Sequence, residues 1–317
     1  MEFRQALPVG FVLGGDYRIV DVLGQGGFGL TYRAEDARLG APVAIKEYFP
    51  ADMALREADA SVRAKSKREE GIFNWGRDKF LDEARTLARF RNPGIVRVSR
   101  LFEAHNTAYM VLDFEAGPSL AQWRQELSHP PPQAELDRIA TSLLDAVSVV
   151  HEAGVLHRDI KPANIIMRGG SEPVLIDFGA ARQSLSARSK TVHAIVTPGY
   201  SPKEQYALDV DRQGPWSDLY ALGATFYFLV TGRAPADALS RDFEQAMPMA
   251  TDGREPYRES FLAAIDRAMS IRAEDRPQSV QEWRRQLIDG EGAAGQGWTA
   301  ALAPTVLAPA GAGVGAT

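Results

Sequence analysis

The sequence predicts an α+β fold with two unequal lobes: a small lobe built on an antiparallel sheet with one main helix, and a larger helical lobe. Residues 17–46 alternate apolar and polar side chains on both sides of a glycine cluster, which is typical of strands joined by a tight turn. Residues 135–151 repeat apolar side chains at helical spacing, and residues 218–230 are apolar nearly all round. The sequence Glu115-Ala116-Gly117-Pro118 separates the two regions, because glycine and proline interrupt regular elements.

Composition and charge exclude several classes of protein. The chain has 317 residues, of which 45% are hydrophobic and 24% charged, as in globular chains with a sizeable core. It has no cysteine, which excludes disulfides, thiolate nucleophiles and cysteine-ligated zinc. The net charge of -5 argues against nucleic acid as the main partner. Neither a signal-peptide pattern nor a run of about 18 apolar residues occurs, so we expect no membrane segment in this chain. We expect a cytoplasmic protein, or the cytosolic part of a longer membrane-anchored one.

The small lobe is expected over residues 17–115, after an N-terminal extension of residues 1–16. Alternating patterns predict strands at 17–23, 30–36, 42–48, 95–104 and 107–115. Residues 48–76 are polar and charged, and we expect them to form an exposed insertion that is partly helical. Phe80, Ala84 and Leu87 fall on one face and predict a helix over residues 78–90.

The helical lobe is expected over residues 116–288. Its helices are predicted at 135–151, at 218–230 and at 278–288. Because it is apolar all round, the segment 218–230 is expected to be a buried central helix, capped by Ser217 and ended by Gly232. Residues 289–317 are rich in Gly, Ala and Pro, and we interpret them as a flexible tail rather than a poor membrane segment.

The glycine cluster Gly24-Gln25-Gly26-Gly27-Phe28-Gly29 fits the pattern G-x-G-x-x-G. Glycines let backbone N–H groups approach phosphate oxygens, although an ordinary glycine hairpin would show the same residues. A dinucleotide-binding fold requires a helix at the third glycine. Strands follow here instead, so the glycines are predicted to form a hairpin loop between strands.

Lys46 and Glu83 are candidates for an ion pair. In the strand Val43-Ala44-Ile45-Lys46, Ala44 and Lys46 share one face. Glu83 lies near the apolar stripe of the helix predicted at 78–90, where a carboxylate is costly unless it is paired. Pairing with Lys46 would satisfy it and hold the ammonium toward phosphates. The alternatives are an edge lysine facing solvent and a glutamate on the solvated flank of the helix.

Two further motifs carry chemistry. The octapeptide His157-Arg158-Asp159-Ile160-Lys161-Pro162-Ala163-Asn164 follows a predicted helix, and Asp177-Phe178-Gly179 follows the apolar stretch Val174-Leu175-Ile176. Oxygen ligands such as those of Asn164 and Asp177, near a lysine, suit a divalent cation that bridges phosphates. Asp159 remains available to accept a hydroxyl proton.

Together these motifs resemble the protein kinase family, specifically the bacterial Ser/Thr protein kinases of eukaryotic, or Hanks, type, over about residues 17–288. The resemblance implies the two-lobed protein kinase fold, ATP, and Mg²⁺ with Mn²⁺ as an alternative. It implies that Asp159 is the catalytic base, that Lys161 and Lys46 contact phosphates and that Glu83 holds Lys46. Asn164 and Asp177 are then the metal ligands. The implied ATP-binding residues are Leu23, Gly24, Gln25, Gly26, Gly27, Phe28, Gly29, Thr31, Ala44, Lys46, Leu112, Asp113 and Glu115.

The resemblance also implies structural roles and shows departures. His157 and Phe178 are expected in the internal hydrophobic spine, with Asp218 as a buried polar residue and Arg276 paired with Glu204. Thr31 stands where the family often has valine. Pro202-Lys203-Glu204 replaces the A-P-E triplet, so only its glutamate is carried over. The Lys46–Glu83 separation is longer than usual because of the insertion, and the residues KEYFP after the strand lysine resemble one bacterial subgroup.

Regulation is expected in the segment 180–198. In the kinases that this chain resembles, the arginine that corresponds to Arg158 holds a phosphorylated residue of this segment. Ser189 and Thr191 are the expected phosphosites, modified by the enzyme itself in trans, whereas Thr197 is expected to contact Asp159 and Lys161. The alternative is that these hydroxyls only solvate a loop.

Three hypotheses for the function are compared. The leading hypothesis is a Ser/Thr protein kinase that transfers the γ-phosphoryl group of Mg-ATP to protein hydroxyls, with protein substrates that the sequence does not name. A catalytically dead kinase-like binding module would lack Lys46, Asp159 or Asn164, and all three are present. A small-molecule kinase would lack the long segment between Asp177 and Glu204 that presents a peptide.

Overall fold

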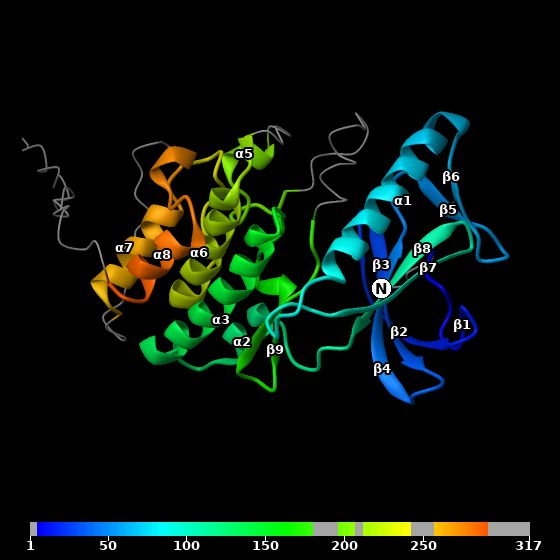
Figure 1. The fold of residues 1–317 in the computed structure, drawn as a ribbon, viewed down its shortest axis with the longest axis horizontal. Helices are drawn as coiled ribbons and strands as arrows, with labels where there is room; N and C mark the ends of the chain where they lie inside the picture. The colour runs from blue at the N-terminus through cyan, green and yellow to red at the C-terminus, as the bar shows by residue number, and fades with distance from the viewer. Residues whose placement is uncertain (1–4, 180–195, 207–211, 242–256, 291–317) are drawn as a thin grey trace, which may run out of the picture.

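The computed structural model describes residues 5–179, 196–206, 212–241 and 257–290. A twisted antiparallel sheet with its helix forms one end of the molecule, and a group of helices forms the other (Figure 1). The predicted two-lobed α+β architecture is therefore confirmed. Within these ranges, no helix is long and apolar enough to cross a lipid bilayer.

The small lobe is organised around a six-stranded sheet with the order β1-β2-β3-β4-β8-β7. Alternation along the strands explains how the sheet forms, since Leu30, Tyr32 and Ala34 of β3 are buried while the intervening residues are more exposed. The five predicted strands all occur. The strands of the sheet are β1 (Val12–Leu13), β2 (Tyr17–Gly26), β3 (Gly29–Asp36), β4 (Ala41–Tyr48), β7 (Val98–Ala104) and β8 (Thr107–Asp113).

The segment 48–76 is partly helical, as predicted, but several of its residues are buried rather than exposed. It contains a two-stranded hairpin, β5 (Ala54–Arg56) and β6 (Val62–Ala64), and its last residues are the start of α1 (Lys67–Leu87). Phe73, Phe80 and Leu87 are buried at intervals of seven residues, so the apolar stripe of α1 extends well upstream of residue 78. The charged residues in the first turns of α1 made this stripe hard to recognise in the sequence. Helix α1 packs against β7 and β8.

The helical lobe contains the predicted helices α3 (Gln133–Glu152), α6 (Pro215–Thr231) and α8 (Val280–Leu287). Gly232 ends α6 in the left-handed conformation, as predicted, but the N-cap is Gly214 and not Ser217. Pro215 occupies the first turn, where its missing N–H costs nothing, and so the helix begins earlier. The remaining elements are α2 (Leu120–Glu126), η1 (Pro162–Asn164), β9 (Ile165–Arg168), β10 (Glu172–Leu175), α5 (Lys203–Tyr206), α7 (Glu259–Ala268) and η3 (Ala273–Asp275).

The central helix α6 organises the core of the large lobe. Phe226 on α6 lies 6.1 Å from the ring of Phe261 on α7 and 6.1 Å from that of Trp283 on α8. The loop after α1 joins the lobes, because the Val96 N–H donates to the Leu175 carbonyl at 3.0 Å and the Leu175 N–H donates to Gly94 at 2.8 Å. The tail expected from residue 289 lies outside the described residues from residue 291 onward.

Candidate active site

An open pocket lies where the glycine hairpin, β4, α1 and the segment after β10 meet. It brings together three groups that the sequence singled out separately: the glycine cluster, Lys46 with Glu83, and Asp177 with Phe178. The lining residues are Gly26, Gly27, Phe28, Gly29, Thr31, Lys46, Tyr48, Phe80, Glu83, Asp177 and Phe178.

The glycine cluster forms the predicted hairpin between strands, with Gly26 opposite Gly29 at the end of the β2–β3 ladder. Gly24 is half-buried, and a Cβ there would meet nothing within 4 Å. At Gly29, by contrast, a Cβ would collide with the Glu47 carbonyl oxygen. Close approach to β4 therefore requires glycine at this position.

Lys46 forms its ion pair with Asp177, whose carboxylate oxygen lies 3.2 Å from the ammonium nitrogen. Glu83 lines the same pocket as Lys46, and the predicted pair between them stays a prediction. Asp177 has φ +57°, in the left-handed region, and its carboxylate reaches Lys46 from this conformation. Glu83 is buried on α1.

Of the other residues expected to bind ATP, Thr31 lines this pocket, whereas Leu23, Ala44, Leu112, Asp113 and Glu115 are not among its lining residues. Ala44 and Leu112 are paired neighbours on β4 and β8. Leu23 is 49% exposed. Asp113 ends β8, and the Glu115 carboxylate accepts two hydrogen bonds of 2.7 Å from Arg168 on β9.

The residues of the octapeptide and of the later segment converge on Asp159. The Lys161 ammonium donates to Asp159 Oδ1 at 3.1 Å, and the Asn164 amide donates to Oδ2 at 2.7 Å. The Thr197 hydroxyl lies 3.2 Å from Oδ1 and 3.1 Å from the Lys161 nitrogen, which is the contact predicted for it. Asp159 itself is buried. One carboxylate is thus oriented by three side chains from two separate segments.

Asp218 in the first turn of α6 holds the backbone of this loop. Its carboxylate accepts the His157 and Arg158 N–H groups, each at 2.8 Å, and lies 2.8 Å from His151 Nε2. Burial alone would raise the pKa of Asp218, but the hydrogen bond with His151, the neighbouring imidazoles and the backbone hydrogen bond from Arg158 outweigh burial and lower the pKa. Arg158 adopts φ +68°, a strained conformation that these bonds maintain.

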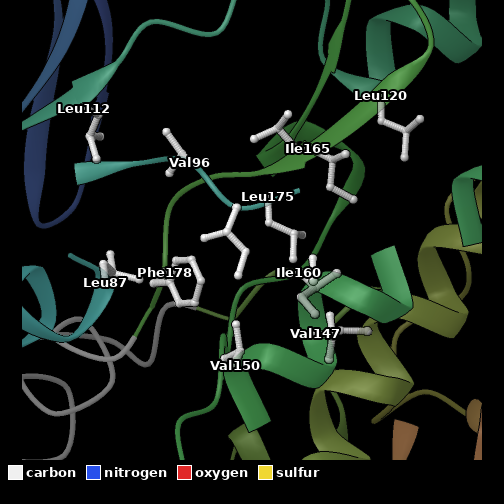
Figure 2. Close-up of a cluster of buried hydrophobic side chains, with 14 of the residues drawn as sticks. Leu87, Val96, Leu112, Leu120, Val147, Val150, Ile160, Ile165, Leu175 and Phe178 are labelled. Atoms are coloured by element: carbon white, nitrogen blue, oxygen red, sulfur yellow. The ribbon is translucent and has the colours of Figure 1, made fainter. Parts of the chain in front are cut away.

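His157 and Phe178 pack against each other with ring centroids 4.2 Å apart. Burial lowers the pKa of His157, which favours the neutral ring. Phe178 belongs to a chain of apolar side chains that runs from Leu87 and Leu112 of the small lobe to Val147 of α3 (Figure 2). The predicted internal position of both residues is therefore observed.

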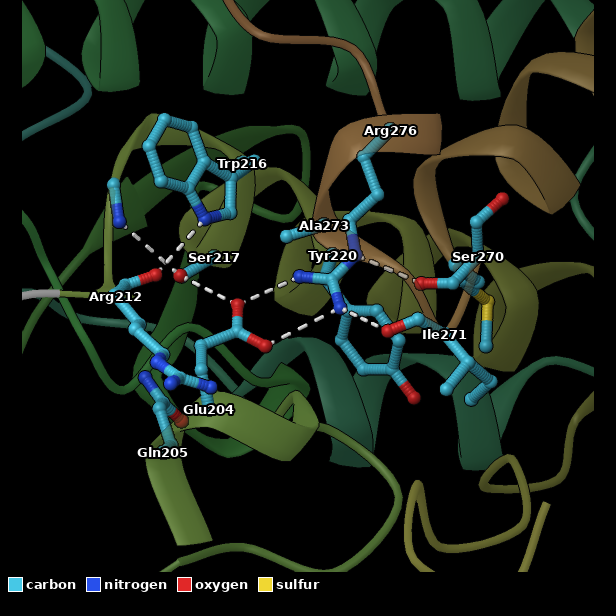
Figure 3. A network of polar contacts seen from close by, with 12 residues as sticks. Glu204, Gln205, Arg212, Trp216, Ser217, Tyr220, Ser270, Ile271, Ala273 and Arg276 are labelled. Atoms are coloured by element: carbon cyan, nitrogen blue, oxygen red, sulfur yellow. Dashed lines mark hydrogen bonds and ion pairs between the residues drawn. The ribbon is translucent and has the colours of Figure 1, made fainter. Parts of the chain in front are cut away.

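Glu204 and Arg276 form the predicted ion pair, with oxygen–nitrogen distances of 2.7 and 3.3 Å (Figure 3). Ser217 donates a hydrogen bond to the same carboxylate at 2.7 Å. Arg276 is fully buried, donates to the Ser270 and Ile271 carbonyls and lies over the Tyr220 ring. The network joins α5 to α6 and to the segment before α8.

Among the residues expected to regulate the site, Ser189 and Thr191 lie outside the described residues. Arg158 is described, and its Nε is buried without a hydrogen-bond partner among the described residues. Burial lowers the pKa of Arg158, while the nearby carboxylates of Asp218 and Glu83 oppose that shift. Glu83 therefore lies near Arg158 as well as in the pocket.

Several residues of the site were missed in the sequence. Tyr48 and Phe80 line the pocket, and Arg168 holds Glu115. Glu47 is fully buried although it adjoins the strand lysine. Its position could have been found, because Val43, Ile45 and Glu47 share the buried face of β4.

Asn164 and Asp177 fit the divalent cation that the resemblance implies. The Ile176 N–H donates to the Asn164 carbonyl at 3.0 Å, which brings the two candidate ligands to adjacent positions. Carboxylate and amide oxygens are the hard donors that Mg²⁺ and Mn²⁺ prefer. The open glycine hairpin and Lys46 border the same space, as a phosphate-bound cation requires.

Comparisons with known proteins agree with this geometry. Residues 17–289 match the family model described as protein kinase domain. Serine/threonine-protein kinase pkn2 of Myxococcus xanthus is 31% identical over 87% of this chain and 32% of its own length. Serine/threonine-protein kinase B of Synechocystis is 31% identical over 75% of this chain and 40% of its own length. The chain thus spans less than half of either relative.

Solved structures show the same fold. The structure titled "PpkA-294 apo form" is 37% identical, with a TM-score of 0.78, and the match covers 89% of this chain and 99% of that chain. The PknI kinase domain of Mycobacterium tuberculosis has a TM-score of 0.65 at 24% identity, over 90% of this chain and 98% of that one. With the family match over most of its length, the chain belongs to the protein kinase domain family.

Proposed function

We propose that this chain is a Ser/Thr protein kinase that transfers the γ-phosphoryl group of Mg-ATP to protein Ser or Thr hydroxyls. The arrangement of Lys161, Asn164 and Thr197 around the Asp159 carboxylate, beside the pocket of Lys46 and Asp177, carries the proposal. The printed names of the relatives support Ser/Thr specificity. All the residues that a catalytically dead module would lack are present.

Each part of the site has a proposed task. Asp159 accepts the proton of the attacking hydroxyl, since its carboxylate is oriented by the Asn164 amide. Lys161 neutralises charge on the transferred group from its position between Asp159 and Thr197. Lys46 and the hairpin N–H groups bind the phosphates. The cation held by Asn164 and Asp177, Mg²⁺ or Mn²⁺, supplies neutralisation of phosphoryl oxygens when bound.

Replacement of Asp159 tests the assignment. Asp159→Asn keeps the shape of the side chain and removes the base, so phosphate transfer to protein should fall by roughly 10²–10⁴-fold while ATP binding persists. Labelled ATP with Mg²⁺, followed by separation of protein from small molecules, measures the transfer. Asp82→Asn, on the exposed face of α1, is the matched control. If Asp159→Asn retained more than about a third of wild-type transfer, the assignment of the base would be wrong.

We further propose regulation through the segment 180–198, by phosphorylation of Ser189 and Thr191 in trans. The buried Nε of Arg158, which has no hydrogen-bond partner among the described residues, supports the proposal, because a guanidinium can bind phosphate oxygens in a bidentate way. Arg158→Ala should abolish any rate difference between phosphorylated and phosphatase-treated enzyme. An unchanged rate after phosphatase treatment of the wild type would contradict regulation and leave the kinase assignment intact.

The proposed organisation is an extension of residues 1–16, a kinase domain of residues 17–288 with the small lobe at 17–115, and a flexible tail of residues 289–317. We propose a cytoplasmic location for the domain, with protein substrates and a second copy of itself as partners. The match over residues 17–289 supports the domain boundaries. Limited proteolysis tests them, since cleavage within 17–288 before cleavage of the tail would contradict the proposed organisation.

A further inference from the structure

The five residues after Lys46, Glu47–Ala51, contact four different parts of the small lobe. We call this segment the strap (residues 47–51). In many hairpins the loop beyond the last strand pair is held by its own turn alone. Here the chain does not leave the sheet at the end of β4 but continues along the glycine hairpin.

Two backbone hydrogen bonds join the strap to the loop. The Phe49 N–H donates to the Phe28 carbonyl at 3.0 Å, and the Ala51 N–H donates to the Gly27 carbonyl at 3.2 Å. These bonds extend the β3–β4 ladder, in which Gly29 pairs with Tyr48. The loop that borders the pocket is thus hydrogen-bonded on one side to the strap.

A buried ionic cluster fixes the base of the strap. The Glu47 carboxylate is fully buried and accepts hydrogen bonds from Tyr32 at 2.6 Å, Tyr109 at 2.8 Å and Arg56 at 2.6 Å. Burial and the adjacent carboxylate raise the pKa of both tyrosines, so they remain donors. Arg56 also lies over the Phe49 ring, with its guanidinium carbon 5.2 Å from the ring centroid.

The N-terminal extension and the β5–β6 hairpin complete this support. Arg56 Nε donates to the Gln5 carbonyl at 2.6 Å, and the Leu7 N–H donates to the Tyr32 hydroxyl at 3.1 Å. The Lys65 ammonium donates to the Ala51 and Asp52 carbonyls, each at 2.9 Å. Buried charges of this kind are retained only when their hydrogen bonds are satisfied.

We propose that the strap is a positioning element that holds the glycine loop ready for the phosphates of ATP, with Glu47 and Arg56 as its positioning residues. The inference rests on the proposed function, which makes this pocket the ATP site. A loop that is already ordered loses less conformational entropy on binding, so the strap should increase affinity for nucleotide. It should affect nucleotide binding more than binding of the protein substrate.

Removal of one backbone donor, the Ala51 N–H, tests the proposal. The Met53 N–H donates to the Pro50 carbonyl at 3.0 Å, which makes Ala51 the second residue of a turn. Proline is favoured at that position, so Ala51→Pro should keep the turn and remove the N–H that donates to Gly27. Ala51→Ser keeps the N–H and is the matched control.

Two measurements on the full chain are needed. Titration calorimetry with a non-hydrolysable ATP analogue and Mg²⁺ gives affinity, and hydrogen exchange of the nucleotide-free chain gives the order of residues 26–29. Ala51→Pro should bind the analogue about 2- to 10-fold more weakly, as expected for the loss of one hydrogen bond. Its loop amides should exchange faster, while Ala51→Ser matches the wild type. Unchanged affinity and exchange in Ala51→Pro would overturn the proposal.

Lys65→Met provides a second variant if Ala51→Pro does not fold. It removes the two hydrogen bonds to the turn and leaves every strap residue in place. It should also weaken binding and speed loop exchange, whereas the exposed Lys79→Met on α1 should not. If the loop amides of Lys65→Met exchanged hydrogen at the wild-type rate, the proposed role of the strap would then be wrong. A wild-type chain that binds the analogue without transferring phosphate would contradict the proposed function alone.

Discussion

Lys46 lies in a pocket that also contains two acidic side chains. It pairs with Asp177 at 3.2 Å, while Glu83 lines the same pocket and also influences Arg158. The charges of Lys46, Asp177 and Glu83 sum to one negative charge if all are ionised. A cation bound at Asp177 would compete with the ammonium for that carboxylate. Movement of Lys46 toward Glu83 is then the electrostatically favoured response.

Asp266 on α7 offers a test of pH dependence away from the site. Burial raises its pKa to about 6, and Arg241 opposes the shift only in part. Between the ordinary value of 3.8 and about 6, the folded chain binds more protons than the unfolded chain, so stability falls as the pH rises through this window. Asp266→Asn should therefore raise the melting temperature above pH 6 and leave it unchanged below pH 4. Melting curves across this pH range measure the effect, with Asp145→Asn as an exposed control. The raised pKa of Asp266 would be contradicted if the two variants showed the same pH dependence.

At the scale of elements, α6 connects the core of the large lobe to the loop that contains His157, Arg158 and Asp159. Its turns are buried, and Asp218 in its first turn accepts the His157 and Arg158 N–H groups. The helix therefore acts as the fixed base on which the strained backbone at Arg158 is maintained.

Asp218→Asn tests this coupling. The amide retains one oxygen but turns an NH₂ group toward a backbone donor, so at least one buried hydrogen bond is lost. We expect a loss of about 1–3 kcal/mol in the free energy of unfolding. We also expect a fall in kcat with little change in the KM for ATP, since the pocket lining does not include this loop. Chemical denaturation and initial rates measure both, and an unaltered kcat in a destabilised variant would restrict Asp218 to a structural role.

Most elements were predictable because their periodicity is local. The stripe of α3 and the strands of the sheet follow directly from side-chain spacing. The start of α1 was not predictable, because the charged residues at 67–70 resemble a solvated loop. The buried Phe73 can be assigned to the apolar stripe of α1 only once the later turns of the helix are placed. Ser217 is a strong N-cap type, but Pro215 sets the first turn, so the hydroxyl serves Glu204 instead.

For the site, sequence motifs identified the residues but not all their partners. Asp159, Lys161 and Asn164 lie within one short stretch, so their meeting was predictable. The pair between Lys46 and Asp177 depends on how β4 and the segment after β10 are oriented, which no local pattern encodes. The strap was missed for a similar reason, because its bonds to Gly27 and Phe28 are made by backbone atoms that carry no sequence signature.

At the scale of the whole molecule, Arg168 joins the two lobes. It lies on β9 of the large lobe and forms two hydrogen bonds of 2.7 Å with Glu115, in the segment that connects the lobes. The same guanidinium donates to the Pro93 carbonyl after α1 at 3.3 Å. A single planar cation thus links the connection between lobes, the α1 loop and the large lobe, a geometry that lysine cannot reproduce.

A double-mutant cycle measures this link. Arg168→Met and Glu115→Gln should each lower the free energy of unfolding, and the pair should couple by about 1 kcal/mol, at the upper end for partly exposed ion pairs because both hydrogen bonds are well formed. Because the connection also borders the expected adenine site, Arg168→Met should raise the KM for ATP more than it changes kcat. Arg138→Met, which removes an exposed pair within α3, is the control. Additive effects of the two changes, with a KM equal to that of the control, would mean that the pair is a surface contact without influence on how the lobes are joined.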